Sequence, residues 1–142
     1  MAHQALDAEV HRFHSRPLED RHCYLLLDGI ALTVKGPAAY RKRLVRCAYG
    51  ITAQGQRELL SIREAKAERE AASGAFLNDL YQRGLFGTAL RLIVTDRHPG
   101  LLATLDLVYP SVPRQRCWVH KLRNVAAKLP RRLQAACLPC SQ

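Results

Sequence analysis

The chain has 142 residues, the size of one domain, and its 48% hydrophobic and 24% charged residues exclude a wholly disordered protein. Twenty-two Lys and Arg against 12 Asp and Glu give a formal net charge of +10, which favours an anionic partner such as nucleic acid. The apolar stretches are no longer than strands, so we expect no membrane span, and the N-terminal residues lack the apolar core of a secretory signal. Five cysteines without an export signal are typical of reduced thiols in the cytoplasm.

The first third of the chain is predicted to be a helix followed by three strands. The spacing of Leu6, Val10 and Phe13 predicts a short helix that Pro17 ends, within a polar lead-in over residues 1–21. Residues 22–34 are apolar almost throughout and predict a buried strand, which Gly36 and Pro37 end. Residues 43–52 and 57–64 are predicted to be the second and third strands. The short links between these strands favour an antiparallel meander.

Helices and strands are then predicted to alternate. Residues 66–83 predict a helix, and residues 89–95 predict a buried strand that Asp96 closes. A helix is expected from Pro99 to Val108, then a short strand over 115–119. The last predicted helix has an apolar stripe that we expect to pack as core: Trp118, Leu122, Val125 and Leu129. The order predicts an α/β fold with a mixed sheet and flanking helices, as in the ribonuclease H-like fold.

Two aspartates stand out against this pattern. Asp28 interrupts an apolar strand, where an ionised carboxylate needs compensation, so it is either a metal ligand or an exposed residue at a strand end followed by a turn at Gly29. Asp96 follows a buried strand at its carboxyl end, where ligand sites gather, or else it caps the helix starting near Pro99. If the two strands are neighbours, the pair suits Mg²⁺ or Mn²⁺.

The C-terminal third carries a second candidate site and most of the positive charge. Cys117, His120, Cys137 and Cys140 have a C-x2-H-x16-C-x2-C spacing that could bind zinc. Residues 97–142 hold 8 basic side chains and one acidic, Asp106, a net charge of +7. The basic residues of the last helix and its exit are either DNA contacts or a solvated helix face: Lys121, Arg123, Asn124, Lys128, Arg131 and Arg132.

Several of these segments resemble one family. YLLLDG around Asp28, RGLFGTALRLIVTD ending at Asp96, and QRCWVHKLRNV over 115–125 are similar to the Mutator-type transposases of bacterial insertion sequences. AYGITAQGQRELLSIREA over 48–65 also resembles their second and third strands. The resemblance implies a ribonuclease H-like catalytic core over 22–130 that cuts and joins DNA with two metal ions, Mg²⁺ or Mn²⁺.

The resemblance also assigns residues and partners. It implies that Asp28 and Asp96 are the first two of three catalytic acids, and that Cys117 and His120 form the family's Cys-x2-His signature. The implied partners are insertion-element ends and target DNA, with homo-oligomers in the full-length family and a cytoplasmic, nucleoid-associated location.

One departure from the family pattern concerns the third acid. The family has a Glu well beyond the signature, whereas this chain has no Glu after Glu70, and Arg97 stands where the family often has Gly. We therefore expect an incomplete, inactive transposase with a basic tail over 131–142. The alternative is a non-catalytic basic DNA-binding protein with a zinc site.

Overall fold

The computed structural model describes residues 2–65, 70–96 and 98–133. Its elements follow the predicted order: α1 (Ala2–Ser15), β1 (His22–Lys35), β2 (Tyr40–Thr52), β3 (Arg57–Ala65), α2 (Glu70–Gln82), β4 (Leu92–Thr95), α3 (Pro99–Val108), β5 (Arg114–Arg116) and α4 (Trp118–Ala127). β4 begins three residues later than predicted, because the Leu90 N–H donates to the Gly87 carbonyl in a turn. Cys23 and Cys47 are free, buried thiols.

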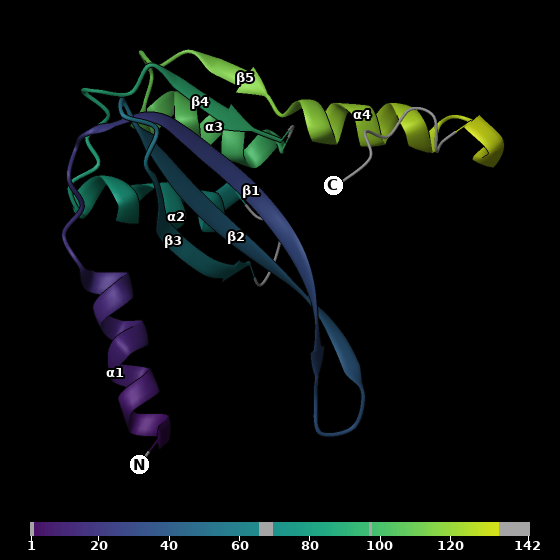
Figure 1. Ribbon diagram of the computed structural model, residues 1–142, viewed down its shortest axis with the longest axis horizontal. Coiled ribbons are helices and arrows are strands. Elements are labelled where there is room, and N and C mark those ends of the chain that lie inside the picture. Colours follow the sequence, from purple (N-terminus) through teal and green to yellow (C-terminus); the bar gives the residue numbers. More distant parts are fainter. Residues whose placement is uncertain (1, 66–69, 97, 134–142) are drawn as a thin grey trace.

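The strands form one mixed sheet in the order β3-β2-β1-β4-β5 (Figure 1). β1 pairs antiparallel with β2, and β2 pairs antiparallel with β3, as the short links predict. β4 returns to the other side of β1 and runs parallel to it, and β5 runs parallel to β4. The chain thus places its first and fourth strands side by side.

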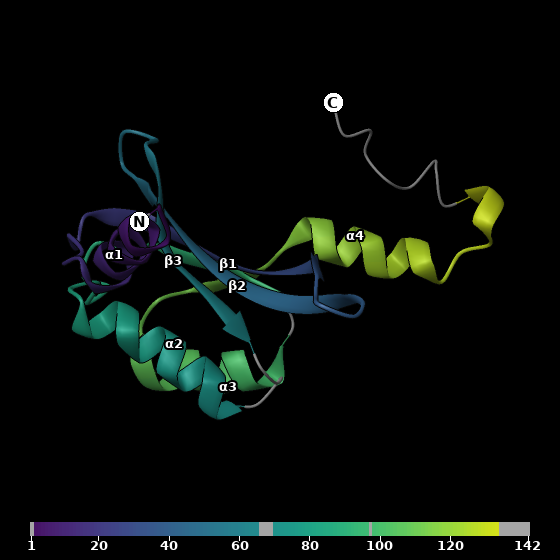
Figure 2. The ribbon, with the colours of Figure 1, turned by 90° about the horizontal axis from the view of Figure 1, so that it is seen from below.

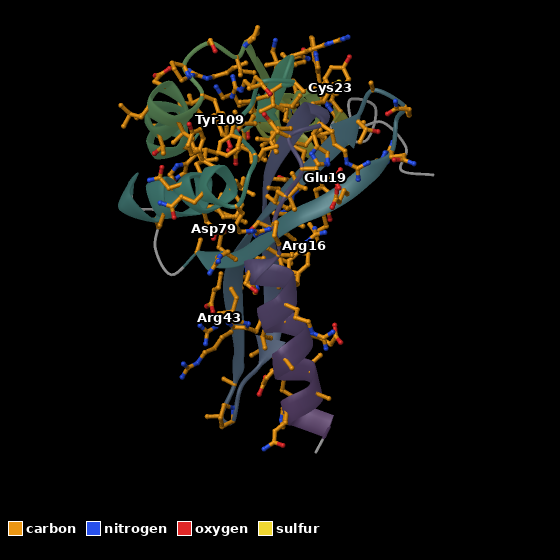
Figure 3. All side chains as sticks on the ribbon, turned by 90° about the vertical axis from the view of Figure 1, so that its left-hand side faces the viewer. Arg16, Glu19, Cys23, Arg43, Asp79 and Tyr109 are labelled. Atoms are coloured by element: carbon orange, nitrogen blue, oxygen red, sulfur yellow. The ribbon has the colours of Figure 1, made fainter. Side chains whose placement is uncertain are left out.

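Helices α2 and α3 cover one face of this sheet (Figure 2). Their apolar faces pack on alternate residues of β1 and β4, and the resulting core includes Leu25, Leu27, Ile93, Leu77 and Leu105. The Tyr109 hydroxyl at the end of α3 donates a 2.7 Å hydrogen bond to the Leu85 carbonyl, and Figure 3 shows this ring between helix and sheet. The core therefore lies between the central strands and two helices.

The last helix does not pack as the sequence predicts. α4 leaves the edge of the sheet and extends away from it (Figures 1 and 2), so the expected core stripe is wrong for Trp118 and Val125, which are 59% and 51% exposed. Ala126 is buried instead. Periodicity shows that a helix has an apolar face, but it does not show what covers that face.

Candidate metal and DNA site

Asp28 lies inside β1, which continues seven residues beyond it to Lys35. This placement excludes the strand-end alternative, since both Asp28 and Gly29 pair with β2. One carboxylate oxygen, Oδ1, is buried without a hydrogen-bond partner among the described residues. The His120 Nε2 lies 3.4 Å from this oxygen. A buried carboxylate oxygen without a hydrogen bond is unfavourable unless a cation lies close to it.

Asp96 lies next to Asp28 across the sheet. The last pair of the parallel β1–β4 ladder joins Leu27 to Thr95, so Asp28 is the next residue of β1 and Asp96 the residue directly after β4. Neighbouring strands lie about 4.8 Å apart, which brings their backbones close at this point. Both aspartates line one pocket of about 100 Å³.

Another residue, His98, caps α3 in place of Asp96. The N-cap of α3 is His98, whose Nδ1 accepts a 3.3 Å hydrogen bond from the Leu101 N–H, and Pro99 follows at the first turn. Asp96 is therefore not required to begin α3.

The Cys-x2-His signature lies beside both aspartates. Cys117 is the N-cap residue of α4, and its backbone N–H donates a 2.8 Å hydrogen bond to the carbonyl of Thr95, the residue before Asp96. His120 follows in the first turn of α4 and reaches Asp28. The start of α4 thus contacts both the end of β4, next to Asp96, and the Asp28 side chain of β1.

Only two of the four zinc ligands predicted from spacing, Cys117 and His120, lie among the described residues. Cys137 and Cys140 lie outside the described residues, and Cys117 is a free, half-buried thiol. His120 turns its Nε2 toward Asp28. Residues 2–65, 70–96 and 98–133 contain no group of three or more His, Cys, Asp or Glu side chains that could hold a metal ion. As two hard oxygen donors in one pocket, Asp28 and Asp96 fit part of the coordination shell of Mg²⁺ or Mn²⁺.

The pocket contains two residues that the sequence analysis missed. Arg46 is buried, and its Nη1 donates a 2.7 Å hydrogen bond to the Ser73 hydroxyl of α2. His98 also lines the pocket. The sequence did contain a signal for Arg46, because it is a charged residue at an inward position of an otherwise apolar stretch of β2. Arg46 lines the same pocket as both aspartates, but it pairs with Gly29, so its side chain lies on the α2 face of the sheet and that of Asp28 on the opposite face.

Cys47 is a buried thiol beside Asp28. Burial, and after it the negative charge of Asp28, raises the pKa of the Cys47 thiol. Cys47 faces Asp28 across the β1–β2 ladder. The thiol therefore stays protonated, as expected for a core cysteine rather than a nucleophile.

The predicted DNA-contacting residues all lie on exposed surface. Along α4 and the residues that follow it, these are Lys121, Arg123, Lys128, Arg131 and Arg132. The Lys121 Nζ lies 4.7 Å from the centre of the Trp118 ring, a cation–π contact at the start of the helix. The projecting helix thus presents cations on a surface open to a large partner.

Comparison with known proteins identifies the class of this chain. Residues 1–140 match the family described as "Transposase, Mutator family". The transposase for insertion sequence element ISRM5 of Rhizobium meliloti (strain 1021) is 38% identical over 133 residues, which are 94% of this chain and 33% of that protein. The transposase for IS1081 of Mycobacterium tuberculosis is 35% identical over 127 residues, covering 89% of this chain and 30% of that protein.

The chain belongs to the Mutator family of transposases, and it spans about a third of the length of the curated relatives it matches. Among solved structures, a chain of the simian T-cell lymphotropic virus intasome in complex with PP2A regulatory subunit B56 gamma aligns with 85% of this chain and 48% of its own length. The identity is 10% and the TM-score 0.42, a similarity too low to define the fold. No helix in the described part of the chain is long and apolar enough to cross a membrane.

Proposed function

We propose that this chain carries the first part of a ribonuclease H-like catalytic core that acts on the DNA of an insertion element. The observation that supports the proposal most is that Asp28, on β1, and Asp96, directly after the parallel neighbour β4, line one pocket. Asp28 and Asp96 would hold Mg²⁺ or Mn²⁺. Such an ion, when bound, activates water and stabilises the leaving oxygen in phosphodiester chemistry.

The residues around the pair have supporting roles in this proposal. His120 would orient the Asp28 carboxylate, and Cys117 would fix the start of α4 against the end of β4. The cations of α4 would bind the phosphates of element ends and target DNA, which would place the protein on the nucleoid. A homo-oligomer would bring two such sites to the two ends of an element.

The third acid of the family pattern is missing from these 142 residues. After Asp96 the only acidic residue is Asp106, on α3, which forms an ion pair with Arg114. We propose that the third ligand is not supplied by this segment and that the 142 residues alone are inactive.

A chimera tests the proposal. Residues 1–142 would replace the matching segment of the Rhizobium meliloti relative, with which they share 38% identity. We expect the chimera to mobilise its insertion element in cells, and Asp28→Asn or Asp96→Asn to abolish this. Asp106→Asn, the matched control, should leave mobilisation within about twofold because its carboxylate is exposed and outside the pocket. A mobile chimera that tolerates Asp28→Asn would overturn the proposal.

A further inference from the structure

The end of the β1–β2 hairpin projects beyond the rest of the sheet (Figure 1). The β4 ladder ends at Leu27 and the β3 ladder ends at Leu44, so within the described residues the strand residues 32–35 and 40–43 pair only with each other. We call residues 32–43 the hairpin arm. A two-stranded ribbon without a packed face is marginally stable by itself. The arm is therefore a candidate binding surface for a partner molecule.

The charge of the arm selects the kind of partner. Residues 29–57 contain no acidic residue, and the arm alone contains four cations: Lys35, Arg41, Lys42 and Arg43. All four are exposed. Arg43 forms a 2.5 Å ion pair with Glu64 of β3, whereas no ion pair within the described part of the chain involves Arg41 or Lys42. Figure 3 labels Arg43 where the arm leaves the sheet.

The arrangement of these cations suits a duplex. Because side chains alternate along a strand, Arg41 and Arg43 share one face of the ribbon with Leu32 and Val34, while Lys42 lies on the other face with Thr33. The major groove of DNA admits a two-stranded ribbon, and both of its walls are phosphate backbones. Cations on both faces of an arm can therefore reach both walls.

We infer that the hairpin arm is a second DNA-binding element, which holds the duplex to one side of the Asp28 pocket. This inference rests on the proposed function. Arg43 and Arg41 pair with residues four and six positions beyond Asp28. At about 3.3 Å per strand residue they lie roughly 13–20 Å from it, a distance of about 4–6 base pairs. The exposed Leu32 and Val34 face the sugars and base edges inside the groove.

Neutral substitutions in the arm test the inference. Arg41→Gln with Lys42→Gln removes two cations while keeping polar side chains of similar length. Arg57→Gln with Arg91→Gln removes two exposed cations from the opposite end of the sheet and is the matched control. The charge-conserving exchange Arg41→Lys with Lys42→Arg reports whether the side chains or only their charges matter. Far-ultraviolet circular dichroism checks that each variant is folded.

Binding of each variant to a labelled duplex of random sequence is measured by fluorescence anisotropy across a salt series. We expect the arm variant to bind roughly tenfold more weakly at low salt and to lose about 1.8 from its log–log salt slope, the equivalent of two phosphate contacts. The control and the exchanged variant should stay within about twofold of the unmodified chain.

Three results would overturn the inference, and they are distinguishable. Unchanged DNA binding by the arm variant overturns the role of the arm alone and leaves the proposed function standing. Unchanged DNA binding with an altered oligomeric mass shows that the arm contacts a second copy instead. An unmodified chain that binds no duplex at any salt concentration overturns the DNA partner and the inference together.

Discussion

At the scale of single residues, the most informative group is the Asp28 carboxylate. It lies within a continuous strand, its Oδ1 is buried without a hydrogen-bond partner among the described residues, and the His120 Nε2 lies 3.4 Å from that oxygen. Such an arrangement is unfavourable unless charge is supplied nearby. A divalent ion shared with Asp96 would supply that charge.

Substituting either aspartate should therefore weaken the binding of Mn²⁺. We expect Asp28→Asn and Asp96→Asn each to raise the dissociation constant of the 142-residue chain about tenfold or more, because affinity depends on the number of charged ligands. Electron paramagnetic resonance of free Mn²⁺ measures this directly. Asp106→Asn is the control and should bind as the unmodified chain does. Normal binding by both single variants would show that the pair is not the site.

A second residue of interest is Glu58 at the opposite end of the sheet. It accepts a 2.9 Å hydrogen bond from Arg16 and lies 2.9 Å from the buried His22 Nε2. Burial alone would raise its pKa, but the hydrogen bonds from His22 and Arg16, with their charges, lower it below the usual 4.5. A carboxylate with a lowered pKa in the folded state stabilises the protein above its unfolded pKa and loses this effect in acid.

Glu58→Gln should accordingly reduce stability near neutral pH by roughly 1–3 kcal/mol, since a partner of buried polar groups is removed. The difference from the unmodified chain should shrink as the pH falls below about 4.5, through the folded-state pKa. Urea unfolding of both proteins at a series of pH values measures this difference in the free energy of unfolding. A difference that does not change with pH would mean that the ionised carboxylate has no special role.

At the scale of elements, the connection after α2 depends on Gly84. Its φ is +122°, and a Cβ at this position would lie 2.2 Å from the backbone oxygen of Leu18. The lead-in and α2 meet here, where the Leu18 N–H donates a 2.6 Å hydrogen bond to the Arg83 carbonyl. The close approach of the two segments requires glycine.

Gly84→Ala should destabilise the chain by about 2–3 kcal/mol, because it combines an unfavourable φ with a backbone clash. Gly55→Ala is the matched control: φ is +81° there, but nothing lies within 4 Å of the added Cβ, so about 1 kcal/mol is expected. Thermal unfolding compares the two. Equal effects would show that the segments separate easily.

The second element of interest is α4 with the residues that follow it. Its cations are exposed, and residues 97–142 carry a net charge of +7. Contact of this segment with phosphates would make binding steeply salt-dependent and largely independent of sequence.

Reversing two of these charges should weaken duplex binding. We expect Arg131→Glu with Arg132→Glu to lower affinity by roughly tenfold or more and to reduce the log–log salt slope by about 1.8. Arg57→Glu with Arg91→Glu changes the net charge equally at a distant surface and should have a smaller effect. If the two double variants weaken binding equally, only the total charge matters, and α4 is not a specific contact.

At the scale of the whole molecule, two cationic projections extend from the sheet that carries Asp28 and Asp96. The hairpin arm and α4 extend from the sheet in different directions (Figure 1). Asp28 lies on β1, and Asp96 directly follows the neighbouring strand β4. Under the proposed function, this arrangement would hold DNA on either side of the metal-binding pair Asp28 and Asp96. It supplies two carboxylates, whereas a pair of metal ions needs more ligands to be held in fixed geometry.

The 142-residue chain alone should therefore show no strand transfer. Labelled insertion-element ends incubated with the chain and Mg²⁺ or Mn²⁺ should remain uncut, because the ions are not held with enough ligands around the scissile phosphate. A chimera with the remaining segments of a relative is the positive control. Robust cleavage by the chain alone, abolished by Asp28→Ala, would contradict this and make Asp106 the first candidate for the third ligand.

Much of this architecture was predictable from local sequence. The bounds of α3 were predicted as Pro99 to Val108, since Pro99 favours a helix start and Pro110 ends it, and the meander of β1 to β3 was predicted from short links and β-forming residues. The family was predicted from contiguous motifs around Asp28, Asp96 and Cys117, and the family match confirms it. Helix and strand periodicities, caps and breakers act over a few residues, so they can be seen without the fold.

Other features were decided only by the tertiary structure. The pairing of β1 with β4 joins aspartates that are far apart in the chain. The pairing of β1 with β2 removes the strand-end alternative for Asp28, and the His98 cap of α3 removes the cap alternative for Asp96. The exposure of the α4 stripe and the projection of the hairpin arm also depend on where neighbouring elements end. The pattern of apolar and charged residues indicates which face of a helix or strand is apolar and which face is polar. What covers that face is decided by contacts between segments distant in sequence, which no local pattern encodes.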